Sequence, residues 1–106
     1  MRRIVAVLSD THAGHRLGLM PPDLTLYDEA PDGTLAPYTP QQTAVQQWLW
    51  HCYCDDMAEV VALADDDPLT VIHNGDLTWG RKYATELVCT REANQYLIAV
   101  ANLAPW

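Results

Sequence analysis

Basic residues are scarce in this chain of 106 residues: six Lys and Arg stand against fourteen Asp and Glu, which gives a formal net charge of −8. A protein that binds a nucleic-acid backbone or an anionic membrane mainly through charge needs an extended basic surface. The composition therefore argues against extended nucleic-acid binding. Nucleic acid remains open as a partner through a local contact, but the charge does not indicate it.

Long apolar runs are also absent near the N-terminus. The run Ile4 to Leu8 is shorter than the roughly 7–15 residues of a signal sequence and the roughly 20 of a spanning helix. The three cysteines are an odd number, and Cys52 and Cys54 should point in different directions on a helix. We therefore expect no membrane association and reduced thiols in a soluble, cytoplasmic protein.

A glycine-rich nucleotide-binding turn is missing as well. The sequence that follows the first apolar run is SDTHAGH, which does not contain the G-x-G-x-x-G pattern of a Rossmann-like nucleotide binder. What remains is the composition of one small globular domain, with 49% hydrophobic residues.

Two strands and a long loop are predicted first. Residues 3–9 are β-branched and almost continuously apolar, which is typical of a strand buried on both faces of a parallel sheet. Residues 69–73 form a second short run of this kind. Between them, residues 13–38 contain scattered glycine and proline without a sustained period, which predicts a loop of unusual length.

Two amphipathic helices are predicted next. The first begins at TPQQ, where Thr39 can cap the helix, Pro40 suits its first position and Gln42 completes a capping box. It should end before Pro68 and bury one apolar stripe, made of Val45, Trp48, Leu49, Cys52, Tyr53, Met57, Val60, Val61 and Ala64. The acidic residues that precede Pro68 are interpreted as a surface turn. A second amphipathic helix is expected over about 81–103, with the apolar positions Tyr83, Leu87, Val88, Ala93, Leu97, Ile98 and Ala101.

This order of elements predicts an α/β fold with a parallel β-α-β unit. Ligands bind at the carboxyl edge of such a sheet, where Asp10, His12 and Asp76 should lie side by side. Carboxylate oxygen and imidazole nitrogen suit divalent metals, and one carboxylate can bridge two ions. Either motif alone could be a simple turn signal, but their occurrence at two matching strand ends favours a metal site.

These residues carry a resemblance to a known family. SDTH at 9–12 and NGD at 74–76 resemble the first two motifs of the calcineurin-like metallophosphoesterases, whose later motifs are Gly-Asn-His-Asp/Glu and further histidines. A narrower resemblance to the phage and prophage branch rests on GHRLGLMPPD, QQWLW, NGDLTWG and TELVCTREANQ. The resemblance implies the N-terminal β-α-β-α portion of a metallophosphoesterase-type α/β sandwich, with a phage origin.

The resemblance also implies a chemistry. Asp10 and His12 would hold the first of two divalent ions, such as manganese, iron or zinc, and Asp76 would bridge both. Hydroxide generated at this centre would hydrolyse a phosphate mono- or diester. Protein phosphate, a nucleic-acid end and a small phosphodiester all remain open as substrates.

The later motifs of the family do not occur before Trp106. We therefore expect residues 1–106 to form a single, incomplete phosphoesterase domain that carries only the first half of the site. Its uncovered sheet edges should favour self-association, and Trp48, Trp50 and Trp106 should be unusually exposed. The alternative is a catalytically inactive, truncated module that binds metal weakly or acts through protein contacts.

Weaker candidates surround the two motifs. His15, close to the first motif, and Arg81 are the candidates for substrate binding, and Arg81 could bind a substrate phosphate through two hydrogen bonds. For both residues a solvated surface position is the more common alternative. Trp79 is expected either to form a wall of the site or simply to pack.

Overall fold

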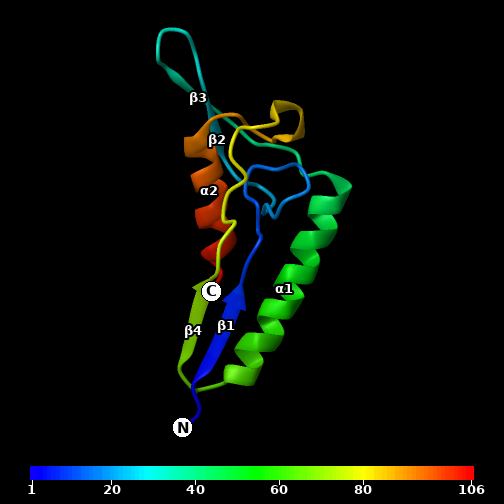
Figure 1. Ribbon diagram of the computed structural model, residues 1–106, viewed down its shortest axis with the longest axis vertical. Coiled ribbons are helices and arrows are strands. Elements are labelled where there is room, and N and C mark those ends of the chain that lie inside the picture. The colour runs from blue at the N-terminus through cyan, green and yellow to red at the C-terminus, as the bar shows by residue number, and fades with distance from the viewer.

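The computed structural model describes residues 1–106 as a mixed α/β protein. Two strands, β1 (Ile4–Leu8) and β4 (Leu69–His73), form a parallel pair in which Ile4 lies opposite Leu69 and Leu8 opposite His73. Figure 1 shows α1 (Ala44–Ala64), a helix in the connection between them, running beside β1. The predicted parallel β-α-β unit is therefore confirmed, and both strands end at the same edge.

The β1–β4 sheet is covered on one face only. Alternate side chains of a strand point to opposite faces, and Ala6 is buried while Val5 and Val7 are 55% and 63% exposed. Ile72 of β4 is also exposed. The prediction that the first strand is buried on both faces is wrong, because no element of the chain covers the second face.

A hairpin interrupts the predicted long loop. Strands β2 (Leu26–Glu29) and β3 (Leu35–Tyr38) pair antiparallel and project away from the β1–β4 sheet (Figure 1). Their turn contains Gly33 at φ +85° and an Asp32 side chain that accepts hydrogen bonds from Thr34. An Asp-Gly pair between two short β-rich runs is a recognised hairpin signal, so this part of the prediction was wrong for a reason visible in the sequence.

The first helix, α1 (Ala44–Ala64), begins four residues later than predicted. The cap is Thr43, which accepts a hydrogen bond from the Gln46 amide and donates its own amide to the Gln46 side chain. Thr39 and Gln42 offer the same spacing, but the fully buried Gln46 also donates to two loop carbonyls, those of His15 and Gly18. These additional bonds favour the later start.

The predicted apolar stripe of α1 is mostly not buried. Among its members only Ala64 is buried, and Val45, Trp48 and Val61 are 44%, 65% and 49% exposed. The expected exposure is confirmed for Trp48, whereas Trp50 and Trp106 are half-buried. The helix ends before Asp65, as predicted. No helix of the structure combines the length and apolar character needed to cross a membrane.

The C-terminal segment is less helical than predicted. A short 3₁₀ helix, η1 (Ala84–Glu86), precedes α2 (Glu92–Leu103), so the helix starts eleven residues after position 81. Its buried face also differs from the predicted stripe, since Leu97 is 38% exposed and Ala93 is exposed. The buried positions are Asn94, Gln95, Ile98, Ala99 and Asn102.

Three amides on α2 explain this difference. Asn94 exchanges two hydrogen bonds with the Tyr27 backbone in β2, and Gln95 exchanges two with the Gly80 backbone. Asn102 donates to the Leu19 carbonyl. Because buried backbone groups outside regular structure need partners, amides at these positions provide hydrogen bonds that apolar side chains cannot make.

The hydrophobic core lies at the loop end of the molecule rather than under the β1–β4 sheet. It is formed by Ala13, Met20, Leu26, Cys89, Ile98 and Ala99, with Leu24, Tyr38, Leu77 and Val88 packed against it. These residues come from the hairpin, from α2 and from the segments that follow β1 and β4. The core therefore holds together the loops that carry the two motifs.

The buried thiol in this core predicts a pH dependence of stability. Burial raises the pKa of Cys89 from 9.0 to about 11. The folded protein then retains the thiol proton more tightly than the unfolded chain, so the contribution of Cys89 to the free energy of unfolding should be constant below pH 9 and fall between pH 9 and about 11. Urea unfolding at several pH values measures this decline. Cys89→Ala should reduce the decline and Cys54→Ala should not; an unchanged pH profile in Cys89→Ala would refute the assignment.

Candidate metal centre

The segments that follow β1 and β4 stay paired beyond the ends of the strands. Five backbone hydrogen bonds of 2.7–3.0 Å join residues 8–13 to residues 74–79: Asn74 to Leu8, Asp10 to Gly75, His12 to Asp76, Ala13 to Leu77 and Trp79 to Ala13, each written from amide to carbonyl. The two motifs are therefore held in register by the main chain itself. This pairing explains why residues so distant in sequence have a defined relative position.

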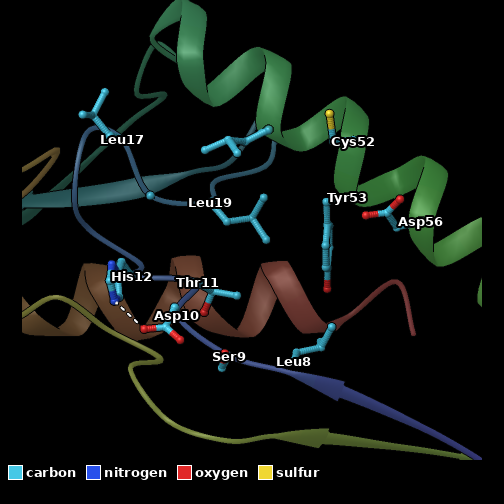
Figure 2. A pocket seen from close by; sticks show the side chains of 12 residues that line it. Leu8, Ser9, Asp10, Thr11, His12, Leu17, Leu19, Cys52, Tyr53 and Asp56 are labelled. Carbon is cyan, nitrogen blue, oxygen red and sulfur yellow. Dashed lines mark ion pairs between the residues drawn. The ribbon is translucent and has the colours of Figure 1, made fainter.

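A pocket opens between the end of β1 and α1 (Figure 2). Asp10 and His12 lie at one end of it, and Cys52, Tyr53 and Asp56 of α1 form the opposite side. The first motif is therefore accessible to a small molecule from this side.

The backbone at the three candidate ligands is unusual. Asp10, His12 and Asp76 have φ values of +56°, +48° and +53°, and only two other non-glycine residues, Asp23 and Asp65, have positive φ. This left-handed conformation is uncommon outside glycine, although Asp and His adopt it more readily than most residues. Such conformations concentrate at functional sites because the surrounding structure must maintain them. Their coincidence with the two motifs favours a functional role.

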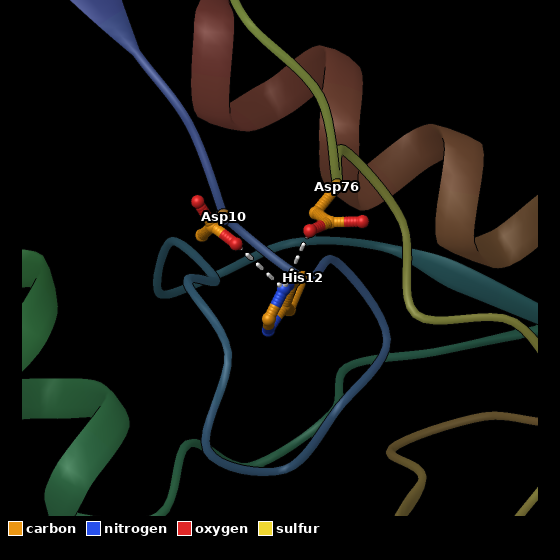
Figure 3. Close-up of side chains that lie close together, drawn as sticks. All are labelled: Asp10, His12 and Asp76. Carbon is orange, nitrogen blue, oxygen red and sulfur yellow. Dashed lines mark ion pairs between the residues drawn. The ribbon is translucent and has the colours of Figure 1, made fainter.

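The three side chains point toward one another (Figure 3). One possible ligand atom from each of Asp10, His12 and Asp76 lies within 4.8 Å of the others. The His12 Nε2 atom is 3.4 Å from an Asp10 oxygen and 3.8 Å from an Asp76 oxygen. The juxtaposition predicted from the two strand ends is thus present in the structure.

Electrostatics keep one of the carboxylates charged. Interaction with the Ser9 hydroxyl, followed by contacts with Asp76 and His12, holds the pKa of Asp10 below its ordinary value. Asp10 is therefore ionised at neutral pH, which is the form that binds a cation. The side chains of Asp10 and Asp76 are 60% and 71% exposed, while that of His12 is 30% exposed.

Two further residues, Thr11 and His73, pack next to the three candidate ligands and were not predicted from the sequence as part of the site. Thr11 is buried between the first two ligands, and its Oγ1 lies 2.9 Å from His73 Nε2. Thr11 also donates to the Leu77 carbonyl, and the Gly75 amide donates to His73 Nδ1. This arrangement assigns the ring proton to His73 Nε2. The available signal was the position of His73 as the last residue of the strand before NGD.

Trp79 forms an aromatic wall beside the first motif. Its ring centroid is 5.0 Å from that of His12 and 4.6 Å from that of His15. His15 is not among the three clustered ligands: its Nδ1 accepts the Leu17 amide, and its Nε2 lies 3.6 Å from Glu86. The structure therefore gives His15 a packing position next to Trp79.

Arg81 lies outside the cluster. Its side chain is 64% exposed and forms an ion pair of 3.2 Å with Glu92 on α2. The contact with a substrate phosphate stays a prediction, and it would require Arg81 to leave Glu92.

The donor set fits one divalent ion. Two carboxylates and one imidazole are ligands that manganese, iron and zinc accept. No second group of three His, Cys, Asp or Glu side chains is close enough to hold a metal. Both nitrogens of His73 face hydrogen-bond partners, and His51 is exposed on α1. The chain thus provides three possible donors at one place, Asp10, His12 and Asp76.

Compared with known proteins, the chain matches no family model, no curated protein and no solved structure. The resemblance to calcineurin-like metallophosphoesterases therefore rests on the motif residues alone. The arguments below depend on the geometry of the cluster and the chemistry of its three side chains.

Proposed function

We propose that this chain binds a divalent metal ion through Asp10, His12 and Asp76 and belongs to a metal-dependent phosphoesterase. The observation that carries the proposal is the convergence of these three side chains within 4.8 Å at the common edge of two parallel strands. Backbone hydrogen bonds between the two motif segments support it, because they hold the ligands in place before an ion arrives.

The chemistry of the donors supports a hydrolytic role. A divalent ion held there would lower the pKa of water and neutralise negative charge on a phosphate ester. The residues of this chain would orient that ion: His12 through one ring nitrogen, and Asp10 and Asp76 through carboxylate oxygens. Asp76 follows the second strand and is the most exposed of the three, which suits it to bridge to a second ion.

We propose further that these residues represent one half of a two-ion centre. Three donors leave several coordination positions of a manganese or zinc ion open. The clustered side chains include no further protein donors for a second ion. Without them the protein should bind metal but hydrolyse a phosphate ester poorly.

A titration with Mn²⁺ tests this proposal. Isothermal titration calorimetry of the chain should give one bound Mn²⁺ per molecule, and excess EDTA should reverse the binding. Hydrolysis of bis(4-nitrophenyl) phosphate with Mn²⁺ should stay close to the rate without protein. Two sub-millimolar Mn²⁺ sites would contradict the half-site, and the absence of any Mn²⁺ binding would refute the metal centre.

The main alternative is a module that acts through protein contacts. One observation favours it: the uncovered face of the β1–β4 sheet exposes Val5, Val7 and Ile72, and both edges of this two-stranded sheet are free. Exposed strand edges readily pair with a further strand, so self-association is the expected behaviour of such a module. Sedimentation equilibrium distinguishes the two roles, because a dimer that is insensitive to Mn²⁺ favours the contact module.

The state of the cysteines bears on localisation. Cys52, Cys54 and Cys89 are all free thiols. Free thiols persist in reducing compartments, and we therefore propose that the protein works in the cytoplasm, where a phage-encoded enzyme would also act in its host.

A further inference from the structure

We infer that the pocket between β1 and α1 binds the organic group of the substrate, and that this group carries an uncharged aromatic ring. The inference rests on the proposed function, because it places the phosphate of the same molecule at the metal ligands. We call this space the β1–α1 pocket; Asp10 and His12 line it together with residues of α1. The pocket and the candidate metal centre thus share two side chains and form one continuous surface.

The size and the walls of the β1–α1 pocket suit a ring. Its volume is about 280 Å³, and a cavity of about 150 Å³ in another protein accommodates benzene. The apolar part of the wall is formed by Leu8, Leu17, Leu19, Leu49, Cys52 and Tyr53. A ring of one or two cycles therefore has room and can contact hydrocarbon on several sides.

Tyr53, the aromatic residue of the β1–α1 pocket, is held in a defined position. The Tyr53 hydroxyl donates a 2.6 Å hydrogen bond to the Asn102 carbonyl and accepts one of 2.5 Å from the Trp106 indole. The ring centroid of Trp50, also on α1, lies 5.5 Å from that of Tyr53. Figure 2 shows the Tyr53 side chain extending from α1 toward the end of β1. Because these bonds restrict Tyr53, it can stack on a bound ring without first being ordered.

The charges around the pocket restrict the ligand further. No Lys or Arg lines it, whereas Asp10 lies at the metal end and Asp56 on α1. A second phosphate or a carboxylate on the organic group would meet these acidic side chains without a compensating cation. The pocket therefore selects an aryl or similarly flat, uncharged group attached to a single phosphate.

Binding of two phosphonates tests the inference without requiring turnover. In the presence of Mn²⁺, calorimetry should show that phenylphosphonate binds the chain roughly tenfold more tightly than methylphosphonate, because burial of an aromatic ring contributes at least about that factor. Cys52→Phe places a ring in the pocket and should abolish this preference. Cys54→Phe is the matched control, since Cys54 lies on the same helix outside the pocket, and it should keep the preference.

A second measurement separates failure of the pocket from failure of the metal centre. Saturation-transfer NMR of the metal-free protein should detect binding of phenol, and Cys52→Phe should remove this signal. Equal affinity for the two phosphonates, or a ring preference that survives Cys52→Phe, would overturn the inference. If phenol binds but neither Mn²⁺ nor methylphosphonate does, the proposed function fails, and with it the link between pocket and phosphate. If nothing binds, both are overturned.

Discussion

Asp76→Asn should reduce the affinity of the chain for Mn²⁺ by at least about tenfold, because even mutation of a residue that only hydrogen-bonds to a metal ligand often reduces affinity by that factor. The change removes a charged ligand from a cluster of three. It should leave the fold intact, because asparagine has nearly the same size as aspartate and also tolerates the left-handed backbone at φ +53°. Calorimetric titration measures the affinity, and circular dichroism verifies the fold.

Asp65→Asn is the matched control for this experiment. Asp65 is also an exposed aspartate with positive φ, at +51°, but it lies at the end of α1 among the acidic residues that precede Pro68. The Asp65→Asn variant should bind Mn²⁺ with the same affinity as the unmodified chain. If Asp65→Asn lost as much affinity as Asp76→Asn, the acidic turn rather than the motif cluster would be the binding site.

Gln95→Leu should lower the free energy of unfolding by about 2 kcal/mol or more. The side chain is 2% exposed and exchanges two hydrogen bonds, of 2.9 and 2.7 Å, with the amide and carbonyl of Gly80. Leucine would leave both groups of the half-buried Gly80 without this partner, and an unsatisfied group costs about 1–3 kcal/mol when it is buried. Urea unfolding followed by circular dichroism measures the loss.

The same variant should also weaken Mn²⁺ binding. Gln95 contacts both motif segments. It forms a hydrogen bond with Gly80, four residues after Asp76. Its side chain also packs closely against Gly14, two residues after His12, where an added Cβ would lie 2.6 Å from Gln95. Gln47→Leu, on the exposed surface of α1, is the control and should change neither quantity appreciably. A stable Gln95→Leu protein would show that water can replace the amide at Gly80.

The parallel pairing of the two strands was predictable because it depends on local pattern and on general rules of connection. Runs of β-branched residues predict β1 and β4, and a helix between them makes a parallel crossover the default. The meeting of Asp10, His12 and Asp76 follows from that topology, since both strands end at one edge. Asp-Gly at 32–33 also predicts a hairpin, whereas the scattered glycine and proline of residues 13–38 led to the prediction of one long loop.

The roles of His73, Gln46 and the amides of α2 were not predictable in the same way. A buried amide is chosen by the backbone groups that need a partner, and these groups lie 15 to 83 positions away in the chain. Apolar periodicity favours Leu97 and Ala93 for the core, yet Asn94 and Asn102 are buried instead. Periodicity measures hydrophobicity only, whereas the irregular loops packed against α2 require hydrogen bonds.

The residue pattern alone was sufficient to identify which side chains converge and what kind of ion they suit, because the ligand types and the strand ends are local features. Whether that convergence has a defined geometry depends on long-range contacts. The pairing of the two motif segments, the left-handed backbone at the ligands and the Thr11–His73 bond all involve residues from both strand ends. Such contacts exist only when the chain is folded, since each partner is placed by a different element.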